Sequence, residues 1–162
     1  MNKNAKDFLI RIQKTKDKNQ LNAGILDSIL EDRKNVLDLN IAVGVDVSGS
    51  ISRQQFNQFM AQLDAIKGLS RVKVLEVDTQ IIALYDYYKM PQNKVVRLGG
   101  GGGTAFSPAF TKFRQLKPDA ILFMTDGEVS DSIADPGIPT GWILTSKGRK
   151  PYGFGEVVVK LA

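Results

Sequence analysis

Residues 35–45 are the part of the sequence that most constrains what this chain can fold into. Apolar side chains alternate along one face of this run, and small ones, Ala42 and Gly44, lie on the other, where they would let a helix approach closely. A strand that is apolar or small on both faces is typical of the centre of a covered, usually parallel, sheet. We therefore predict a central strand over Asn35–Val45. Its face with the larger side chains carries Leu37, Leu39, Ile41, Val43 and Val45.

A second feature is a pair of short β runs, residues 72–77 and 81–85, rich in branched and aromatic side chains. Asp78-Thr79-Gln80 is too short a connection for a crossover helix, so the pair should form an antiparallel hairpin. Apolar spacing predicts two amphipathic helices on either side of the first strand, over residues 20–34 and after the N-cap Ser52. A third helix should start at Ser107-Pro108, and three strands should follow it, over residues 120–125, 142–145 and 157–159.

This order of elements predicts an α/β fold with three layers, of Rossmann-like type. The central sheet should be mostly parallel with one antiparallel edge strand, and helices should cover both faces. A chain of 162 residues fits one domain, which we place at residues 20–162. We interpret residues 1–19 as a basic N-terminal arm or a short helix.

Composition excludes several kinds of chemistry. The chain has no cysteine and no histidine, which excludes disulfides, thiolate zinc sites, imidazole ligands and a histidine general base. A functional metal would need oxygen ligands, and these favour Mg²⁺, Mn²⁺ or Ca²⁺ over Zn²⁺. No apolar run reaches the roughly 18 residues of a membrane span, and no signal-type stretch opens the sequence. We therefore expect a cytoplasmic protein without membrane contact.

Most of the net charge of +5 comes from the N-terminal arm. Residues 1–20 contain six basic side chains against two acidic ones. A solvated arm is one interpretation, and a contact with nucleic acid or an acidic partner is the other.

Oxygen-bearing side chains follow three separate segments of the predicted sheet. Asp46, Ser48 and Ser50 come directly after the first strand, Thr104 follows a run of five glycines, and Asp126 ends the strand at residues 120–125. The carboxyl ends of parallel strands form the ligand crevice in such sheets, so these groups should meet there. The last two glycines of the run, Gly102 and Gly103, would let the backbone pass close to the site.

The charge of this set favours binding over catalysis. Three of the five groups are neutral hydroxyls, so a divalent cation held by them would keep residual positive charge. Mg²⁺ prefers about six oxygens, and one position could be left for a carboxylate from a partner. Glu128 and Asp131 follow Asp126 closely, and they could accept hydrogen bonds from metal-bound waters or be solvated loop charges.

The sequence Asp46-Val47-Ser48-Gly49-Ser50 matches the D-x-S-x-S motif of von Willebrand factor type A (VWA) domains, which forms their metal-ion-dependent adhesion site. Thr104 and Asp126 match the second-loop threonine and the third-loop aspartate of that family. The glycine run, the segment Phe123–Gly127 and the segment Phe154–Val158 most resemble a bacterial VWA-like domain that follows a metallopeptidase-like domain. The resemblance covers roughly residues 36–161.

This resemblance implies a VWA-type fold and a module that is not an enzyme. It implies Mg²⁺ or Mn²⁺ as the cofactor, with Ca²⁺ less favoured, and a protein partner that offers an aspartate or glutamate. A separate metallopeptidase-like or ATPase protein is a candidate partner. Ala105 follows Thr104 where relatives often carry an acidic residue, which lowers the local negative charge.

Two other functions remain open from the sequence. In the first, the chain is an Mg²⁺- or Mn²⁺-dependent nuclease with a ribonuclease-H-like sheet, using Asp46, Asp126 and either Glu76 or Asp78. Such an enzyme needs several carboxylates close together, whereas hydroxyls occupy most of the ligand positions here. In the second, the chain is a VWA scaffold that no longer holds a metal.

Overall fold

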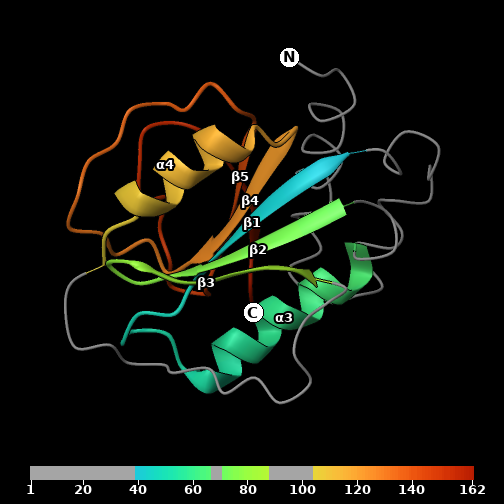
Figure 1. The fold of residues 1–162 in the computed structure, drawn as a ribbon. Coiled ribbons are helices and arrows are strands. Elements are labelled where there is room, and N and C mark those ends of the chain that lie inside the picture. The colour runs from blue at the N-terminus through green and yellow to red at the C-terminus, as the bar shows by residue number, and fades with distance from the viewer. Residues whose placement is uncertain (1–38, 67–70, 88–103) are drawn as a thin grey trace.

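The computed structural model of the protein describes residues 39–66, 71–87 and 104–162. These residues form a six-stranded sheet with the strand order β3-β2-β1-β4-β5-β6 and two helices (Figure 1). The strands are β1 (Asn40–Asp46), β2 (Arg71–Val77), β3 (Ile81–Asp86), β4 (Ala120–Thr125), β5 (Thr140–Leu144) and β6 (Glu156–Lys160). The helices are α3 (Arg53–Ile66) and α4 (Ser107–Leu116).

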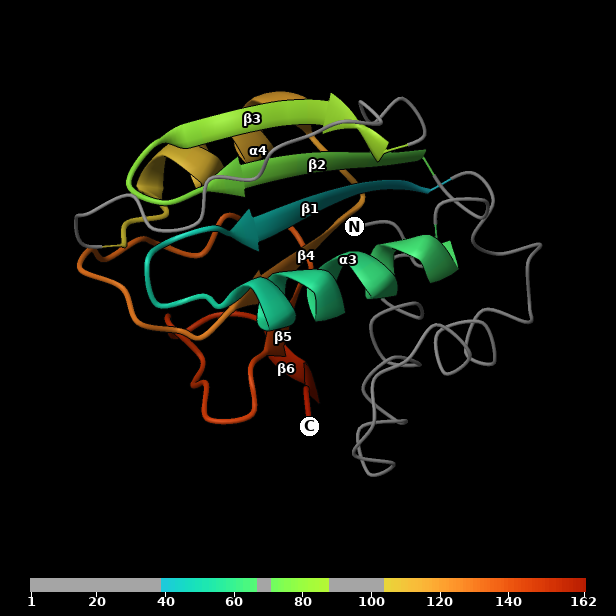
Figure 2. The same cartoon turned by 90° about the horizontal axis from the view of Figure 1, so that it is seen from below.

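The predicted fold class is confirmed. All neighbouring strands pair in parallel except β2 and β3, which form the expected antiparallel hairpin at one edge. Helix α3 lies against one face of the sheet and α4 against the other (Figure 2). The predicted arm at residues 1–19, the helix at 20–34 and the first residues of the first strand, 35–38, lie outside the described residues.

Two apolar cores, one on each face, follow from the alternation of side chains along the strands. The larger face of β1 packs into the core beneath α3, together with Phe59 and Leu63 of that helix. The other face packs under α4 against an aromatic cluster, which consists of Phe106, Phe110, Phe113, Phe123, Trp142, Tyr152 and Phe154. Burial on both faces explains why β1 and β4 read as continuous apolar runs in the sequence.

Helix α3 begins where the sequence predicts. The Ser52 hydroxyl accepts a hydrogen bond from the Gln55 amide at 3.1 Å, and the Gln55 side chain accepts one from the Ser52 amide at 2.9 Å. This reciprocal pair is a capping box, which satisfies two amides that the first helical turn leaves without partners. No helix in the described ranges is long and apolar enough to cross a membrane.

Gly44 has a different role from the predicted one. It pairs with Phe123 of the adjacent strand β4, and the Phe123 ring occupies the space where a side chain at position 44 would lie. A Cβ atom built at Gly44 would approach two ring carbons to 2.4 Å. The glycine thus makes room for an aromatic ring from the next strand, whereas the sequence suggested that it made room for a helix.

We predict that Gly44→Ala destabilises the fold by about 1–3 kcal/mol, because the added methyl forces a buried ring out of a close-packed core. Urea denaturation measures the change in the free energy of unfolding. Gly153→Ala is the matched control, since nothing lies within 4 Å of a Cβ atom at that exposed position. Equal stability of the two variants would contradict this account of Gly44.

Candidate metal-binding site

The candidate site lies at the edge of the sheet where β1 and β4 end. The two strands pair in parallel with Val45 opposite Met124, so Asp46 follows on β1 beside Thr125 at the end of β4. The Val47 amide donates a hydrogen bond of 2.9 Å to the Val77 carbonyl, which brings the end of β2 to the same edge. The β2–β3 turn and the start of α4 also lie at this edge (Figure 2).

Asp46 is fully buried at the centre of this edge. Its Oδ1 accepts a hydrogen bond from the Ser48 amide at 2.9 Å, and its Oδ2 accepts one from the Thr125 hydroxyl at 2.7 Å. A buried carboxylate is costly unless its oxygens are satisfied, and two donors from different segments supply part of that compensation.

Burial raises the pKa of Asp46 above its ordinary value, and the negative charge of Asp126 adds to this effect. Hydrogen bonds from Ser48 and Thr125 oppose it without cancelling it. Among the described residues, no basic side chain contributes to the shift. The charge of Asp126 thus disfavours the ionised form of Asp46, which a positive charge nearby would favour.

The two serines of the motif differ in exposure. Ser48 is buried and Ser50 is exposed, and their hydroxyl oxygens lie 3.3 Å apart. The Ser48 carbonyl accepts a hydrogen bond from the Ile51 amide at 3.0 Å, which closes the turn between β1 and α3. This turn places both hydroxyls beside Asp46, with that of Ser50 on the solvent side.

Thr104 is held by its backbone and keeps its hydroxyl available. Its carbonyl accepts hydrogen bonds from the Ser130 amide at 2.7 Å and the Ser130 hydroxyl at 3.0 Å. The next amide, that of Ala105, donates to the Asp78 carbonyl at 3.1 Å. These bonds tie Thr104 between the end of β2 and the loop after β4, while its hydroxyl makes no hydrogen bond with any described residue.

Asp126 is the second carboxylate of the site. Its Oδ1 accepts a hydrogen bond from the Glu128 amide at 3.0 Å, and its carbonyl accepts one from the Arg149 amide at 3.0 Å. Its Oδ2 has no hydrogen-bond donor in the part of the chain that the structure describes. Asp126 therefore keeps one carboxylate oxygen free to face a ligand.

The structure thus gathers all five predicted ligands, Asp46, Ser48, Ser50, Thr104 and Asp126, at one edge, while Gly102 and Gly103 lie outside the described residues. The donors are oxygens only, which fits a hard cation such as Mg²⁺. Within residues 39–66, 71–87 and 104–162, no three acidic side chains gather into a metal-binding group. A cation at this edge would consequently depend on hydroxyl ligands as well as on the two carboxylates.

Asp131 and Glu128 have different surroundings. Glu128 is exposed, and its amide donates a hydrogen bond to the Asp126 carboxylate. The carboxylate of Asp131 accepts hydrogen bonds from the Ser107 amide and hydroxyl at 2.8 and 2.5 Å and from the Tyr152 hydroxyl at 2.5 Å. Asp131 therefore satisfies an amide at the start of α4, where a negative charge is favourable, and joins that helix to two loops.

Three residues whose hydroxyls hydrogen-bond to residues of the candidate site or its surroundings were not identified from the sequence: Thr125, Ser130 and Tyr152. Thr125 was assigned only to a strand, although a hydroxyl at the end of an apolar run, next to Asp126, was a signal that could have been used. Ser130 and Tyr152 act through contacts across 26 and 21 residues of chain, and no local pattern marks such contacts.

The acidic residues considered for a nuclease are placed differently from a carboxylate cluster. Asp78 uses its Oδ1 to accept hydrogen bonds from the Thr79 and Gln80 amides, which caps the β2–β3 turn. Glu76 is buried within β2, opposite Val45 on β1 and Ala83 on β3.

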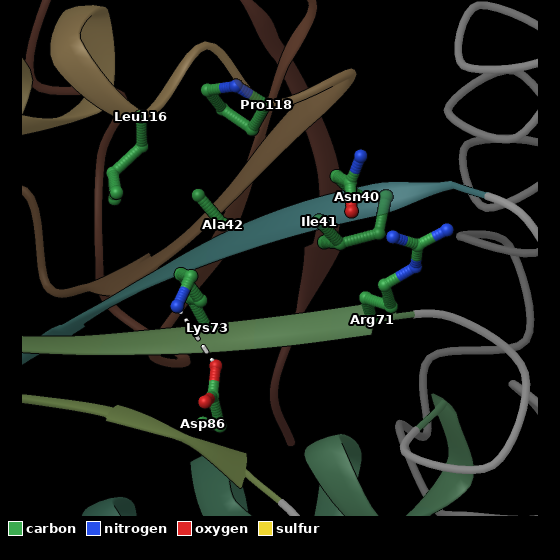
Figure 3. Close-up of a pocket in the computed structure, with 8 residues that line it drawn as sticks. All are labelled: Asn40, Ile41, Ala42, Arg71, Lys73, Asp86, Leu116 and Pro118. Atoms are coloured by element: carbon green, nitrogen blue, oxygen red, sulfur yellow. Dashed lines mark hydrogen bonds and ion pairs between the residues drawn. The ribbon is translucent and has the colours of Figure 1, made fainter.

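A separate cavity of about 400 Å³ lies at the opposite edge, where β1 and β2 begin (Figure 3). It is lined by Asn40, Ile41, Ala42, Arg71, Lys73, Asp86, Leu116 and Pro118. The Lys73 ammonium and the Asp86 carboxylate form an ion pair of 2.9 Å across it. None of the five predicted ligands contributes to this cavity.

The family described as VWA-like domain (DUF2201) matches residues 41–161, which span β1 to the end of β6. The chain belongs to this VWA-like domain family. The match includes the whole candidate site and all six strands of the sheet except the first residue of β1.

Relatives add little about the function of this VWA-like domain. An uncharacterized protein of Thermotoga maritima is 30% identical in an alignment 130 residues long, which covers 74% of this chain and 32% of that protein. The chain thus spans about a third of the length of this relative. No solved structure matches this chain.

We predict that Asp131→Asn lowers the free energy of unfolding at pH 7 by about 1–2 kcal/mol, because the hydrogen bonds to an ionised acceptor weaken. Burial by itself raises the pKa of Asp131, but the hydrogen bonds from Ser107 and Tyr152 outweigh it and hold the pKa below its ordinary value of 3.8. The pKa is thus lower in the folded than in the unfolded chain. The stabilisation is present above pH 3.8 and is lost as the pH falls through the folded-state pKa below that value.

Urea denaturation between pH 7 and pH 3 measures this effect. The difference in stability between the wild type and Asp131→Asn should shrink at the acid end of the series. Asp135→Asn is the matched control, because Asp135 is an exposed loop aspartate that accepts one local hydrogen bond from the Gly137 amide. A difference that stays constant with pH would refute the proposed role of the Asp131 charge.

Proposed function

We propose that this VWA-like domain is a divalent-cation-dependent protein-interaction module. Asp46, Ser48, Ser50, Thr104 and Asp126 would hold Mg²⁺ or, in its place, Mn²⁺. The observation that carries this proposal is the convergence of two neighbouring carboxylates with available hydroxyls at the carboxyl edge of a parallel sheet. The buried carboxylate of Asp46, with its raised pKa, lies near a second carboxylate, and a cation would offset the repulsion between them.

The charge of the site supports binding of an acidic partner. The carboxylates of Asp46 and Asp126 would balance the formal charge of a divalent cation, and the neutral hydroxyls of Ser48, Ser50 and Thr104 would add no further negative charge. Mg²⁺ takes about six oxygen ligands, so the protein groups leave room for an outside oxygen. An aspartate or glutamate side chain from a partner protein supplies an oxygen with the charge that such a cation favours.

A non-catalytic role fits the same residues. The chain has no histidine or cysteine, so the commonest general base and the thiol nucleophile are absent from it. Two-metal hydrolysis requires enough carboxylates to hold ions about 4 Å apart, and hydroxyls take most of the ligand positions here. We therefore favour binding over hydrolysis.

We predict that isothermal titration calorimetry detects binding of Mg²⁺ or Mn²⁺ to the wild type at millimolar concentration or below. Asp46→Ala and the conservative Asp46→Asn should each weaken this binding at least about tenfold, because a carboxylate ligand is lost. Saturating metal should also raise the melting temperature of the wild type, and should raise that of both variants less.

Asp135→Asn is the control for these titrations, since it removes a carboxylate of equal charge from an exposed loop. It should bind the cation as the wild type does. The metal proposal fails if the wild type binds neither ion, or if Asp46→Asn binds as well as the control.

We predict further that capture of a protein partner depends on the cation. A partner retained by the immobilised domain in Mg²⁺ should be released by EDTA and should not be retained by Asp46→Asn, because its carboxylate would lose the ion that it binds. Conversion of the contacting partner residue from glutamate to glutamine, or from aspartate to asparagine, should have the same effect. A partner that stays bound in EDTA would argue against a metal-mediated contact.

A further inference from the structure

Strand β3, at one edge of the described sheet, carries an exposed apolar surface. Ile81, Ile82 and Leu84 expose 39%, 50% and 41% of their surfaces, and they are the large apolar side chains that are exposed within the described residues. Leu75 and Val77 lie on the face of β2 beneath α4 and pair with Leu84 and Ile81, so Leu84 and Ile81 share one face of β3. Ile82 lies between them in the chain, and we call the three residues the β3 patch. Contiguous exposed apolar surface commonly marks an interaction site.

An irregularity in the pairing of β2 with β3 shapes this patch. Val77 pairs with Ile81 and Glu76 pairs with Ala83, so Ile82 has no partner on β2. Such a β-bulge adds one residue to a strand and redirects side chains, and it is common at sheet edges beside functional sites. The unpaired residue here is the most exposed of the three.

The β3 patch begins next to the candidate metal site. Ile81 pairs with Val77, whose carbonyl accepts the Val47 amide directly after Asp46. The Asp78 carbonyl, in the turn that precedes β3, accepts the Ala105 amide directly after Thr104. Two backbone hydrogen bonds therefore join the end of β2 and the β2–β3 turn to two of the three segments that carry predicted ligands, and the views agree with this placement (Figures 1 and 2).

Charge is confined to the far end of the strand. Residues 81–85 are all uncharged. The first acidic side chain, Asp86, forms an ion pair with Lys73 at the end of β3 that lies away from the candidate metal site. Edge strands usually carry charged residues that discourage contact with other chains. The half of β3 nearest the metal site lacks this protection, which fits a surface that is covered when the domain binds its partner.

We infer that the partner segment carries an aspartate or glutamate within a few residues of large apolar side chains, and that these side chains pack on the β3 patch while the carboxylate binds the cation. This inference rests on the proposed function and specifies its partner. The cation accepts any accessible carboxylate, whereas the β3 patch selects those that lie beside apolar residues. Ile81 and Ile82 are then the residues that determine specificity.

A peptide library with a fixed glutamate and short randomised flanks tests this inference on the full chain in Mg²⁺. Peptides that elute with EDTA should be enriched in leucine, isoleucine, valine or phenylalanine near the glutamate. The enriched peptides should bind Ile82→Thr at least about fivefold more weakly than the wild type, since a buried apolar contact is lost. Threonine suits an exposed strand position, so the fold should be retained.

Calorimetry with Mg²⁺ alone separates the two proposals, because Ile82→Thr leaves all five metal ligands in place and should bind the cation as the wild type does. Glu156→Thr, an exposed position on the opposite edge strand β6, is the control and should bind the enriched peptides normally. EDTA-sensitive peptides without apolar enrichment, or unchanged affinity for Ile82→Thr, would overturn the inference and leave the proposed function intact. If no peptide depends on Mg²⁺ while the cation itself binds, the inference fails along with the interaction role.

Discussion

The parallel pairing of β1 with β4 is the constraint on which the site depends. Its register sets Val45 opposite Met124, so that both strands end together and the Thr125 hydroxyl reaches Asp46. Side chains alternate along a strand, and a slip of one residue would turn Asp46 toward the opposite face. The register is fixed by two buried faces at once, including the fit of the Phe123 ring against Gly44. The aromatic core beneath α4 therefore helps to position the Asp46 carboxylate through the register of β1 with β4.

The site combines well-satisfied groups with groups that the protein leaves available. Backbone carbonyls of Thr104 and Asp126 are held by hydrogen bonds from distant loops. The Thr104 hydroxyl and Asp126 Oδ2 are not used by the described residues. A carboxylate buried as completely as Asp46 opposes folding unless it is compensated, and the Ser48 amide and Thr125 hydroxyl supply part of that compensation. The proposed cation would supply the rest.

Much of the fold and the candidate site could be predicted because the relevant signals are local. Apolar runs identified the strands, the short connection at Asp78–Gln80 predicted the hairpin, and Ser52 marked the start of α3. The convergence of the predicted ligands at one edge followed from the rule that parallel strands present their carboxyl ends together. The role of Gly44 was missed because it depends on which ring lies opposite in the register. The roles of Ser130 and Asp131 were missed because their hydrogen bonds join residues 26 and 24 positions apart, which no local pattern marks.

The two edge strands of the described sheet, β3 and β6, differ in a way that could make the proposed site selective among acidic partners. A metal-bound carboxylate contact is strong but generic, since aspartate and glutamate are frequent on protein surfaces. Selectivity requires a second contact whose energy differs between partners. Of the described edge strands, β6 carries charged residues at both ends, Glu156 and Lys160, whereas β3 presents isoleucines at the end beside the site. The bulge at Ile82 increases this exposure at the cost of a regular ladder. If the proposed metal site binds a carboxylate, the apolar start of β3 beside it would supply the second contact that distinguishes one acidic partner from another.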